Sequence, residues 1–176
     1  MYLLIAAIGH RPEAMGGIKR YRDLYHDRMK ALAIAYFQTL ECELPIALLS
    51  GLARGWETSA AAAAIELSIP LIAAPPYLFR DAAWPKPDRA RYRKLLEHAT
   101  ALDDLQLEGK PLVRQQQFNQ HVFHRADRLM TLWNGTWDSR CATAGMMDLV
   151  NQRSVDRGIP IDNLWASWEK YADWLS

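Results

Sequence analysis

Three short segments of the sequence combine residue types that can hold a phosphate or a proton. They read GHRP at residues 9–12, SGLARG at residues 50–55 and WNGT at residues 133–136. Arg11 can bind a phosphate in bidentate fashion, and His10 can exchange a proton near neutral pH. Each segment also has a plainer interpretation: His10 caps a neighbouring element, Arg11 is solvated, and the third segment is an ordinary turn.

The glycine loop at residues 50–55 precedes an alanine-rich segment that favours a helix. Glycine lets a ligand approach the main chain, and the start of a helix offers N–H groups and a positive dipole end. The spacing is neither G-x-G-x-x-G nor the P-loop pattern, so a phosphate site competes with a tight turn beside a small-residue packing face. Glu57, at the start of the predicted helix, is a candidate catalytic acid, and it also complements the helix dipole.

A further cluster surrounds Asn119, because His121, His124 and Arg125 follow it closely. Two histidines three residues apart on a helix could ligate a metal, but no third ligand of the right kind lies nearby in the sequence. No Ser-His-Asp, Cys-His or paired-carboxylate arrangement can be identified from spacing. We therefore expect no metal and no bound cofactor.

Composition limits the classes of protein and partner. The chain has 176 residues, of which 50% are hydrophobic, and a formal net charge of +1. We expect one domain over residues 1–176, and nucleic acid is an unlikely partner because no strong positive charge is present in bulk. No apolar run is long enough to span a membrane, and the first residues read as a buried strand rather than a signal peptide. Cys42 and Cys141 form no spacing pattern, which suits a reducing compartment, so we expect a cytoplasmic protein.

Apolar runs and helical segments alternate along the chain. The apolar runs predict strands at residues 3–8, 46–49, 71–74, 128–133 and 159–161. Periodicity and composition predict helices at residues 19–40, 58–67, 88–99, 112–125, 142–155 and 164–175. This alternation predicts an α/β fold, a single Rossmann-like three-layer sandwich with a mainly parallel sheet.

In sheets of this kind, ligands bind beyond the carboxyl ends of the strands. The loops to search are therefore residues 9–11, 50–57, 75–84 and 133–143. Since the strands are expected to be parallel, the loops around four residues should meet at one edge of the sheet: Gly9, Gly51, Asn119 and Trp133.

The last predicted helix is rich in tryptophan. Trp165, Trp168 and Trp174 cannot all fall on one narrow face of it. Aromatic residues are enriched at protein interfaces, so we expect at least one of them to pack between subunits of a homo-oligomer. The alternative is that this helix is buried on its own sheet.

Four segments, taken in order, resemble motifs of one superfamily. They read GHRPEAMGG (residues 9–17), SGLARGWETSAA (50–61), PPYLFRDAAWPKPDRARYRKLL (75–96) and FNQHVFHRADRLMTLWNG (118–135). Together they resemble the SLOG superfamily, which groups the DprA (Smf) proteins, the LOG-type phosphoribohydrolases and the YpsA-like proteins. The likeness is closest to the YpsA-like branch and covers roughly residues 3–155.

This resemblance implies a Rossmann-like sandwich that binds a nucleotide-like small molecule at the strand ends. With the strand-end argument, it marks these residues as ligand-binding candidates: Gly9, His10, Arg11, Ser50, Gly51, Ala53, Gly55, Glu57, Asn119, Trp133, Asn134, Gly135 and Thr143.

The chain also departs from the family pattern. Glu57 stands where the family has an aspartate, and Phe118 stands where it has an arginine. The segment CAT at residues 141–143 aligns with the family's Gly-Gly-Thr loop. The P-G-G-x-G-T-x-x-E motif of the LOG-type hydrolases and its upstream arginine are missing, so the resemblance does not support phosphoribohydrolase activity.

Several functions are compatible with these observations. The leading hypothesis is a protein that binds or senses a nucleotide or nucleotide derivative. The second is an enzyme that cleaves the N-glycosidic bond of a nucleotide, with Glu57 as acid–base and Arg11 holding the phosphate. The third is a DprA-like binder of single-stranded DNA, against which the near-zero net charge argues. A purely structural protein is the last alternative.

Overall fold

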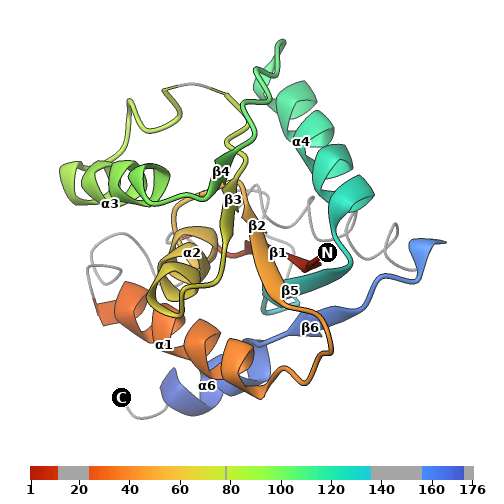
Figure 1. The fold of residues 1–176 in the computed structure, drawn as a ribbon. Helices are drawn as coiled ribbons and strands as arrows, with labels where there is room; N and C mark the ends of the chain where they lie inside the picture. Colours follow the sequence, from red (N-terminus) through yellow and green to blue (C-terminus); the bar gives the residue numbers. More distant parts are fainter. Residues whose placement is uncertain (12–23, 78, 136–155, 173–176) are drawn as a thin grey trace.

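The computed structural model describes residues 1–11, 24–77, 79–135 and 156–172. Within them the chain forms one six-stranded sheet in the order β4-β3-β2-β1-β5-β6, and every neighbouring pair is parallel (Figure 1). The strands are β1 (Leu3–Gly9), β2 (Ile46–Ser50), β3 (Leu71–Ala73), β4 (Ala101–Leu102), β5 (Arg128–Leu132) and β6 (Ile161–Asn163).

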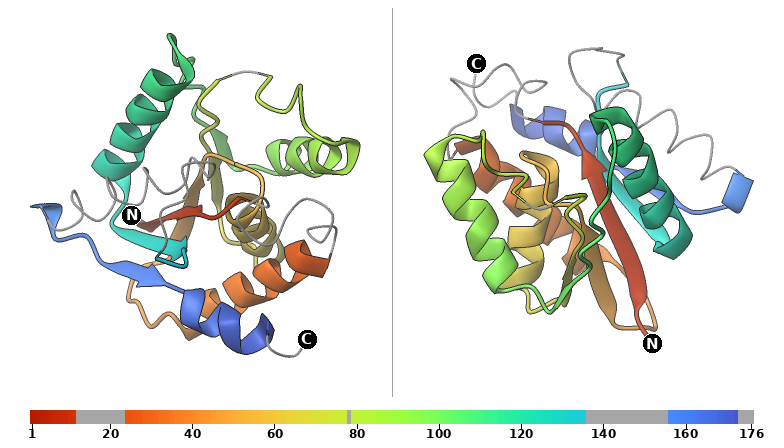
Figure 2. Two further views of the ribbon diagram at one scale, coloured as in Figure 1. Left: turned by 180° about the vertical axis from the view of Figure 1, so that it is seen from behind. Right: turned by 90° about the horizontal axis from the view of Figure 1, so that it is seen from above.

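Helices cover both faces of this sheet. One face carries α1 (Leu24–Thr39), α2 (Trp56–Glu66), α3 (Lys86–Glu97) and α6 (Trp165–Ala172), and the other carries α4 (Pro111–Arg125) (Figures 1 and 2). The predicted α/β three-layer sandwich with a parallel sheet is therefore confirmed.

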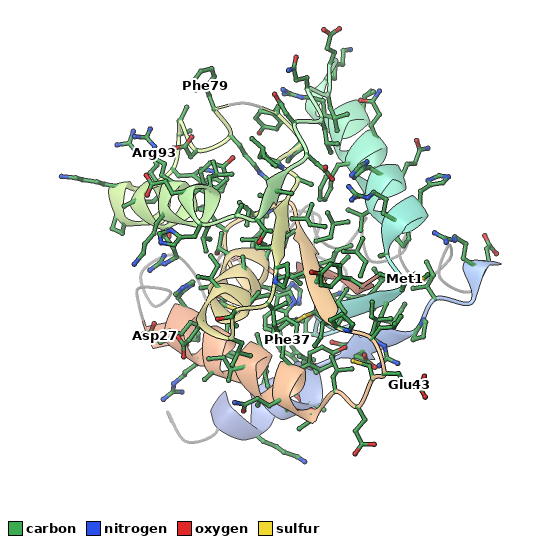
Figure 3. The ribbon with its side chains drawn as sticks, in the orientation of Figure 1. Met1, Asp27, Phe37, Glu43, Phe79 and Arg93 are labelled. Carbon is green, nitrogen blue, oxygen red and sulfur yellow. The ribbon has the colours of Figure 1, made fainter. Side chains whose placement is uncertain are left out.

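Alternate side chains of the strands divide between two hydrophobic cores. In β1, Ile5 and Ala7 pack under α1 and α2, whereas Ala6 and Ile8 pack under α4. This division follows from the two-residue period of a strand, and it explains why a strand covered on both faces reads as one continuous apolar run. Figure 3 shows the same division of inside and outside at α1, where Phe37 is buried and Asp27 is exposed.

Helix α2 is the central element of the first core. Its alanines at 60, 61, 63 and 64 are fully buried, and their small side chains let α1 and the sheet approach closely. Trp56, at the start of α2, is also fully buried and donates a hydrogen bond from Nε1 to the Met130 carbonyl oxygen (3.2 Å). Helix α2 is thereby held against the middle of the sheet, with α1 on one side and α3 on the other (Figure 2).

The order of the strands places a switch point beside β1. The chain runs outward from β1 through β2 and β3 to β4, then returns to place β5 on the other side of β1. The connections after β1 and β5 therefore lead away in different directions, and ligands of open α/β sheets bind at the crevice this creates.

The observed elements differ from the predicted ones mainly at their ends. The last strand was expected at residues 159–161 but lies at residues 161–163, because Ile159 packs into the core under α4 while Ile161 pairs with Leu129. Helix α2 begins at Trp56, two residues earlier than expected, directly after Gly55. Strand β4 was not predicted. The predicted helix at 142–155 lies outside the described residues, as do residues 19–23 of the first predicted helix.

The tryptophans of α6 have different environments. Trp168 packs into the core of its own chain, with its ring centroid 5.8 Å from that of Tyr25. Trp165 is partly exposed and donates from Nε1 to Glu169 (2.7 Å), and Trp174 lies outside the described residues. The homo-oligomer with a tryptophan at its interface stays a prediction. Separately, the helices in the described part of the chain include none that could cross a membrane.

Candidate functional site

The structure brings the predicted loops together at the carboxyl edge of the sheet. The His10 N–H donates to the Leu132 carbonyl oxygen at the end of β5 (2.9 Å). The His10 carbonyl oxygen accepts from the Trp56 N–H at the start of α2 (3.1 Å). The main chain after β1 is therefore bonded on one side to β5 and on the other to the helix after the glycine loop.

Two of the candidate glycines, Gly9 and Gly55, allow the segment after β1 to lie very close to the start of α2. A Cβ on Gly55, which has φ +98°, would lie 2.5 Å from the His10 carbonyl oxygen and 3.1 Å from the Arg11 Cα. A Cβ on Gly9 would lie 2.6 Å from the Trp56 Cδ1. Real side chains do not tolerate such distances, so both positions need glycine for packing within the protein, whatever ligand is bound.

His10 closes the crevice between the loops after β1 and β5. Its side chain is 3% exposed, and Nε2 accepts a hydrogen bond from the Asn134 N–H (3.0 Å). Burial lowers the pKa of His10. Because Nε2 is an acceptor, the proton of the neutral ring lies on Nδ1, for which the described residues supply no partner. The ring also packs edge-on against Trp165, with the centroids 5.4 Å apart. His10 thus links the loop after β1 to the turn after β5 and to α6.

Two N–H groups of the glycine loop, those of Leu52 and Ala53, already have acceptors in the protein. The Leu52 N–H donates to Ser50 Oγ (3.1 Å), and the Ala53 N–H donates to Glu57 Oε2 (2.9 Å). The Thr58 N–H returns to the Ala53 carbonyl oxygen (3.2 Å). Because Glu57 takes the Ala53 N–H, a phosphate oxygen could accept that bond only by displacing the carboxylate. The Leu52 and Ala53 N–H groups are therefore not free donors for an anion at this edge.

Two arginines, Arg80 in the loop after β3 and Arg11 in the loop after β1, act electrostatically on Glu57. The Glu57 side chain is 2% exposed, and burial raises its pKa, while the positive charges of Arg80 and Arg11 and the Ala53 N–H oppose that shift. Arg80 donates from Nη1 to the Gly51 carbonyl oxygen (2.6 Å). Burial lowers the pKa of Arg80, which the Glu57 carboxylate opposes and the Arg11 charge reinforces. The charges of both guanidinium groups therefore favour the ionised form of the Glu57 carboxyl group.

Helix α4 reaches this cluster through Phe118. A Cβ on Gly51 would lie 2.9 Å from the Phe118 Cε2 and 3.1 Å from Glu57 Oε2, so the ring covers Gly51 directly. Asn119, the next residue of α4, is also buried (3% exposed). The side of Gly51 that was expected to face a ligand is therefore occupied by an aromatic ring, at the position where the SLOG pattern has an arginine.

The end of β5 is held by β6. The Trp133 N–H donates to Asn163 Oδ1 (3.2 Å), and Asn163 Nδ2 donates to the Trp133 carbonyl oxygen (2.9 Å). Asn134 and Gly135 continue this turn, and the Asn134 N–H joins it to His10. The last candidate, Thr143, lies outside the described residues.

Sequence reasoning missed Arg80. The loop after β3, residues 75–84, was identified as a place to search, but nothing in the local sequence distinguishes Arg80 from the other arginines near it. The only feature of the sequence that could have identified Arg80 as a site residue was its position in a loop that follows a strand. The histidine cluster has a different role: His121 Nε2 lies 3.3 Å from Asp103 Oδ2, and Arg125 also pairs with Asp103. The described part of the chain holds no group of three or more potential metal ligands.

No protein-family model matches this chain, and no characterised protein is significantly similar to it in sequence. Its function must therefore be argued from the residues and geometry described above.

Proposed function

We propose that this chain binds a nucleotide or nucleotide derivative at the carboxyl edge of its sheet, as a binding or sensing protein without LOG-type phosphoribohydrolase activity. The observation that carries the proposal is the cluster of Arg11, Arg80 and Glu57. Two positive side chains and one negative side chain leave an excess positive charge at the point where ligands of such sheets bind.

A phosphate group would balance that excess. The planar guanidinium group matches a phosphate in bidentate fashion, and it carries five N–H donors. The bond to the Gly51 carbonyl oxygen occupies only part of the donor capacity of Arg80 and fixes the direction of the group. Arg11 is partly exposed and therefore accessible to an entering ligand. The resemblance to the SLOG superfamily independently favours a nucleotide as the bearer of the phosphate.

One observation favours a second function, hydrolysis of an N-glycosidic bond. A buried carboxyl group with a raised pKa beside a binding site is a candidate general acid, and Glu57 has these properties. Glu57 also accepts the Ala53 N–H and is almost fully buried, so it must become accessible before it can act on a substrate. We rank binding first for this reason.

A thermal-shift screen of nucleoside monophosphates and dinucleotides tests binding, and chromatography of the same mixtures after incubation tests cleavage. The proposal predicts stabilisation by at least one nucleotide without release of its base. Stabilisation accompanied by release of the base would favour the hydrolase. If a nucleotide stabilises the protein and Arg11→Ala, still folded, binds it with unchanged affinity, the site is not where we place it.

A further inference from the structure

The face of the sheet that carries α1, α2 and α3 contains a groove lined by residues of these three helices. It has a volume of about 570 Å³, and its lining residues come from α1, α2 and α3. Figure 2 shows these three helices side by side. Small-molecule sites commonly have volumes of about 300–1,000 Å³, so the groove is large enough for a compact ligand. It shares no lining residue with the cluster of Arg11, Glu57 and Arg80.

The walls of the groove carry an excess of positive charge. Lys30 of α1 forms an ion pair with Glu66 (2.9 Å), and Arg91 of α3 forms one with Asp88 (3.0 Å). Lys94, one turn further along α3, is exposed and has no ion-pair partner among the described residues. A single negative charge in the groove would therefore find an ammonium group that no carboxylate already neutralises.

Part of the groove lining, contributed by α2 and α3, is apolar. Ala62 and Ile65 of α2 and Ala90 and Leu95 of α3 line the groove between the charged groups. Contact with such surface favours a ligand that has an apolar part, whereas inorganic ions would leave this surface wet. The lining therefore matches a molecule with one anionic group and one apolar group.

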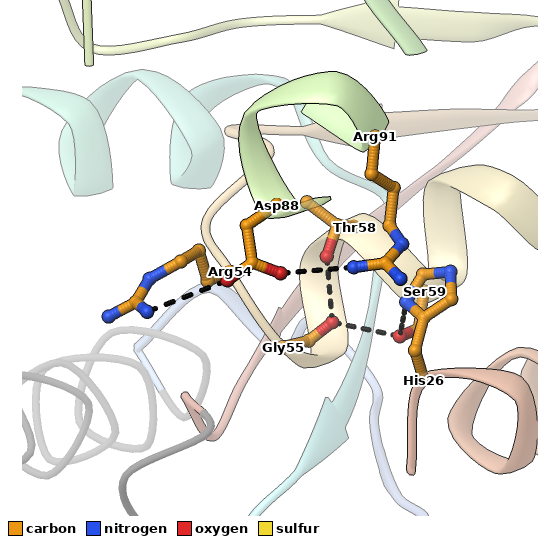
Figure 4. Close-up of polar contacts among 7 residues, drawn as sticks. All are labelled: His26, Arg54, Gly55, Thr58, Ser59, Asp88 and Arg91. Carbon is orange, nitrogen blue, oxygen red and sulfur yellow. Dashed lines mark hydrogen bonds and ion pairs between the residues drawn. The ribbon is translucent and has the colours of Figure 1, made fainter. Parts of the chain in front are cut away.

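One wall of the groove is held in place by a short chain of hydrogen bonds. The Ser59 hydroxyl donates to the Gly55 carbonyl oxygen (2.9 Å), so the 2.8 Å contact between Ser59 Oγ and His26 Nδ1 has the histidine as donor (Figure 4). His26, which lines the groove, is thus attached through Ser59 to the loop before α2. This bonding keeps α1 at a set distance from α2 and supports a site that exists before the ligand arrives.

From these observations we infer that the groove between α1 and α3 is a second binding site, for a small organic anion. The ligand class is a phosphate monoester or carboxylate attached to an apolar group about the size of an aromatic ring. Lys94 and Arg91 contact the anionic group, and the alanine and leucine side chains contact the apolar group. This inference is independent of nucleotide binding at the sheet edge.

The test is a titration of the ¹⁵N-labelled protein, monitored by backbone amide shifts. The probes are phenyl phosphate and benzoate, with inorganic phosphate and neutral benzyl alcohol for comparison. Saturable shifts at Ala62, Ile65, Ala90 and Leu95 are expected with the two organic anions, and weaker binding is expected with either comparison compound. Shifts confined to the sheet edge, around Gly51 and Arg80, would overturn the inference and leave the proposed nucleotide site intact.

Three variants complete the design. Lys94→Glu should weaken phenyl phosphate binding roughly two- to fivefold, the scale of exposed charge pairs. Lys86→Glu makes the same charge change on the same helix outside the groove and should leave binding unchanged. Ala90→Leu fills the groove from an exposed helical position and should abolish binding of both organic anions. Equal effects of Lys94→Glu and Lys86→Glu, or unchanged binding in Ala90→Leu, would overturn the inference.

Discussion

Gly51 lies directly under the ring of Phe118, and no side chain fits between them. A Cβ on Gly51 would also lie 3.1 Å from Glu57 Oε2, so three elements of the fold meet at this residue. A substitution at Gly51 therefore tests packing of the site before it tests ligand binding.

Gly51→Ala should lower the free energy of unfolding by about 1–3 kcal/mol, the usual cost of overpacking a core. Phe118→Leu provides the room that the added methyl group needs, so the double variant should lose less stability than the sum of the single variants. Urea unfolding of the four proteins measures this coupling. Strictly additive effects would show that the ring moves aside freely.

Arg11→Ala should weaken nucleotide binding by about 1.5–3 kcal/mol, or roughly 10- to 150-fold, because a charged hydrogen bond is lost. Its stability should be nearly unchanged, since Arg11 is partly exposed. Calorimetric titration measures the affinity of whichever nucleotide the screen identifies. Arg157→Ala is the matched control, because this exposed arginine precedes β6 and so lies at the opposite edge of the sheet.

Arg80→Ala should weaken the same binding and also destabilise the fold. The variant removes the donor to the Gly51 carbonyl oxygen, and it removes the positive charge that acts most strongly on the buried Glu57 carboxylate. The double variant Arg80→Ala/Glu57→Gln should regain part of the lost stability, because it removes that buried charge as well. Urea unfolding measures the stability of the single and double variants. If the double variant is no more stable than Arg80→Ala, then Arg80 and Glu57 are not a coupled pair.

Glu57→Gln should change how stability depends on pH. Burial raises the pKa of Glu57 above its ordinary value of 4.5. The contribution of Glu57 to the free energy of unfolding is therefore fully present below pH 4.5, and it is lost as the pH rises through the folded-state pKa. A glutamine oxygen can still accept the Ala53 N–H but does not titrate. The advantage of the natural protein over the variant should therefore shrink as pH rises, and a pH-independent difference in urea unfolding would contradict this.

His10 should produce the opposite trend. Burial lowers the pKa of His10 below the ordinary value of 6.5. The contribution of His10 to the free energy of unfolding is therefore fully present above pH 6.5, and it is lost as the pH falls toward the folded-state pKa. His10→Gln keeps an acceptor for the Asn134 N–H without a titrating ring. Stability of the natural protein should fall more steeply than that of the variant between about pH 7 and pH 5. Parallel pH profiles would exclude His10 as the cause.

The alternation of apolar runs was sufficient to predict the parallel sheet, because a strand covered on both faces leaves a continuous apolar signal. The same reasoning placed His10, Gly55 and Trp133 near one edge, since parallel strands end together. It could not find β4, whose two residues are exposed and too few to show a period. It also placed β6 two residues early, because Ile159 and Ile161 are equally apolar and only packing separates their roles.

The interior of the site was harder to predict than its location. A carboxylate at residue 57 suits the start of any helix, but its hydrogen bond back to the Ala53 N–H forms in a buried environment that only the folded protein supplies. The contribution of Arg80 depends on the path of the loop after β3, in which Phe79 is 82% exposed and points outward (Figure 3). Local sequence does not determine such a path, because tertiary contacts select it.

The central position of β1 has a consequence for synthesis of the chain. Strand β1 emerges from the ribosome before both of its neighbours, and of these β2 follows soon after, whereas β5 begins only at Arg128. The Leu4 N–H donates a hydrogen bond to the Asp127 carboxylate, which lies 123 residues later in the chain. Until β5 has been synthesised, the edge of β1 that pairs with it has unpaired N–H and C=O groups. Strands from other chains can pair with such an edge. Nascent chains that stop before residue 128 should therefore be bound by chaperones or aggregate, and release should coincide with the appearance of β5.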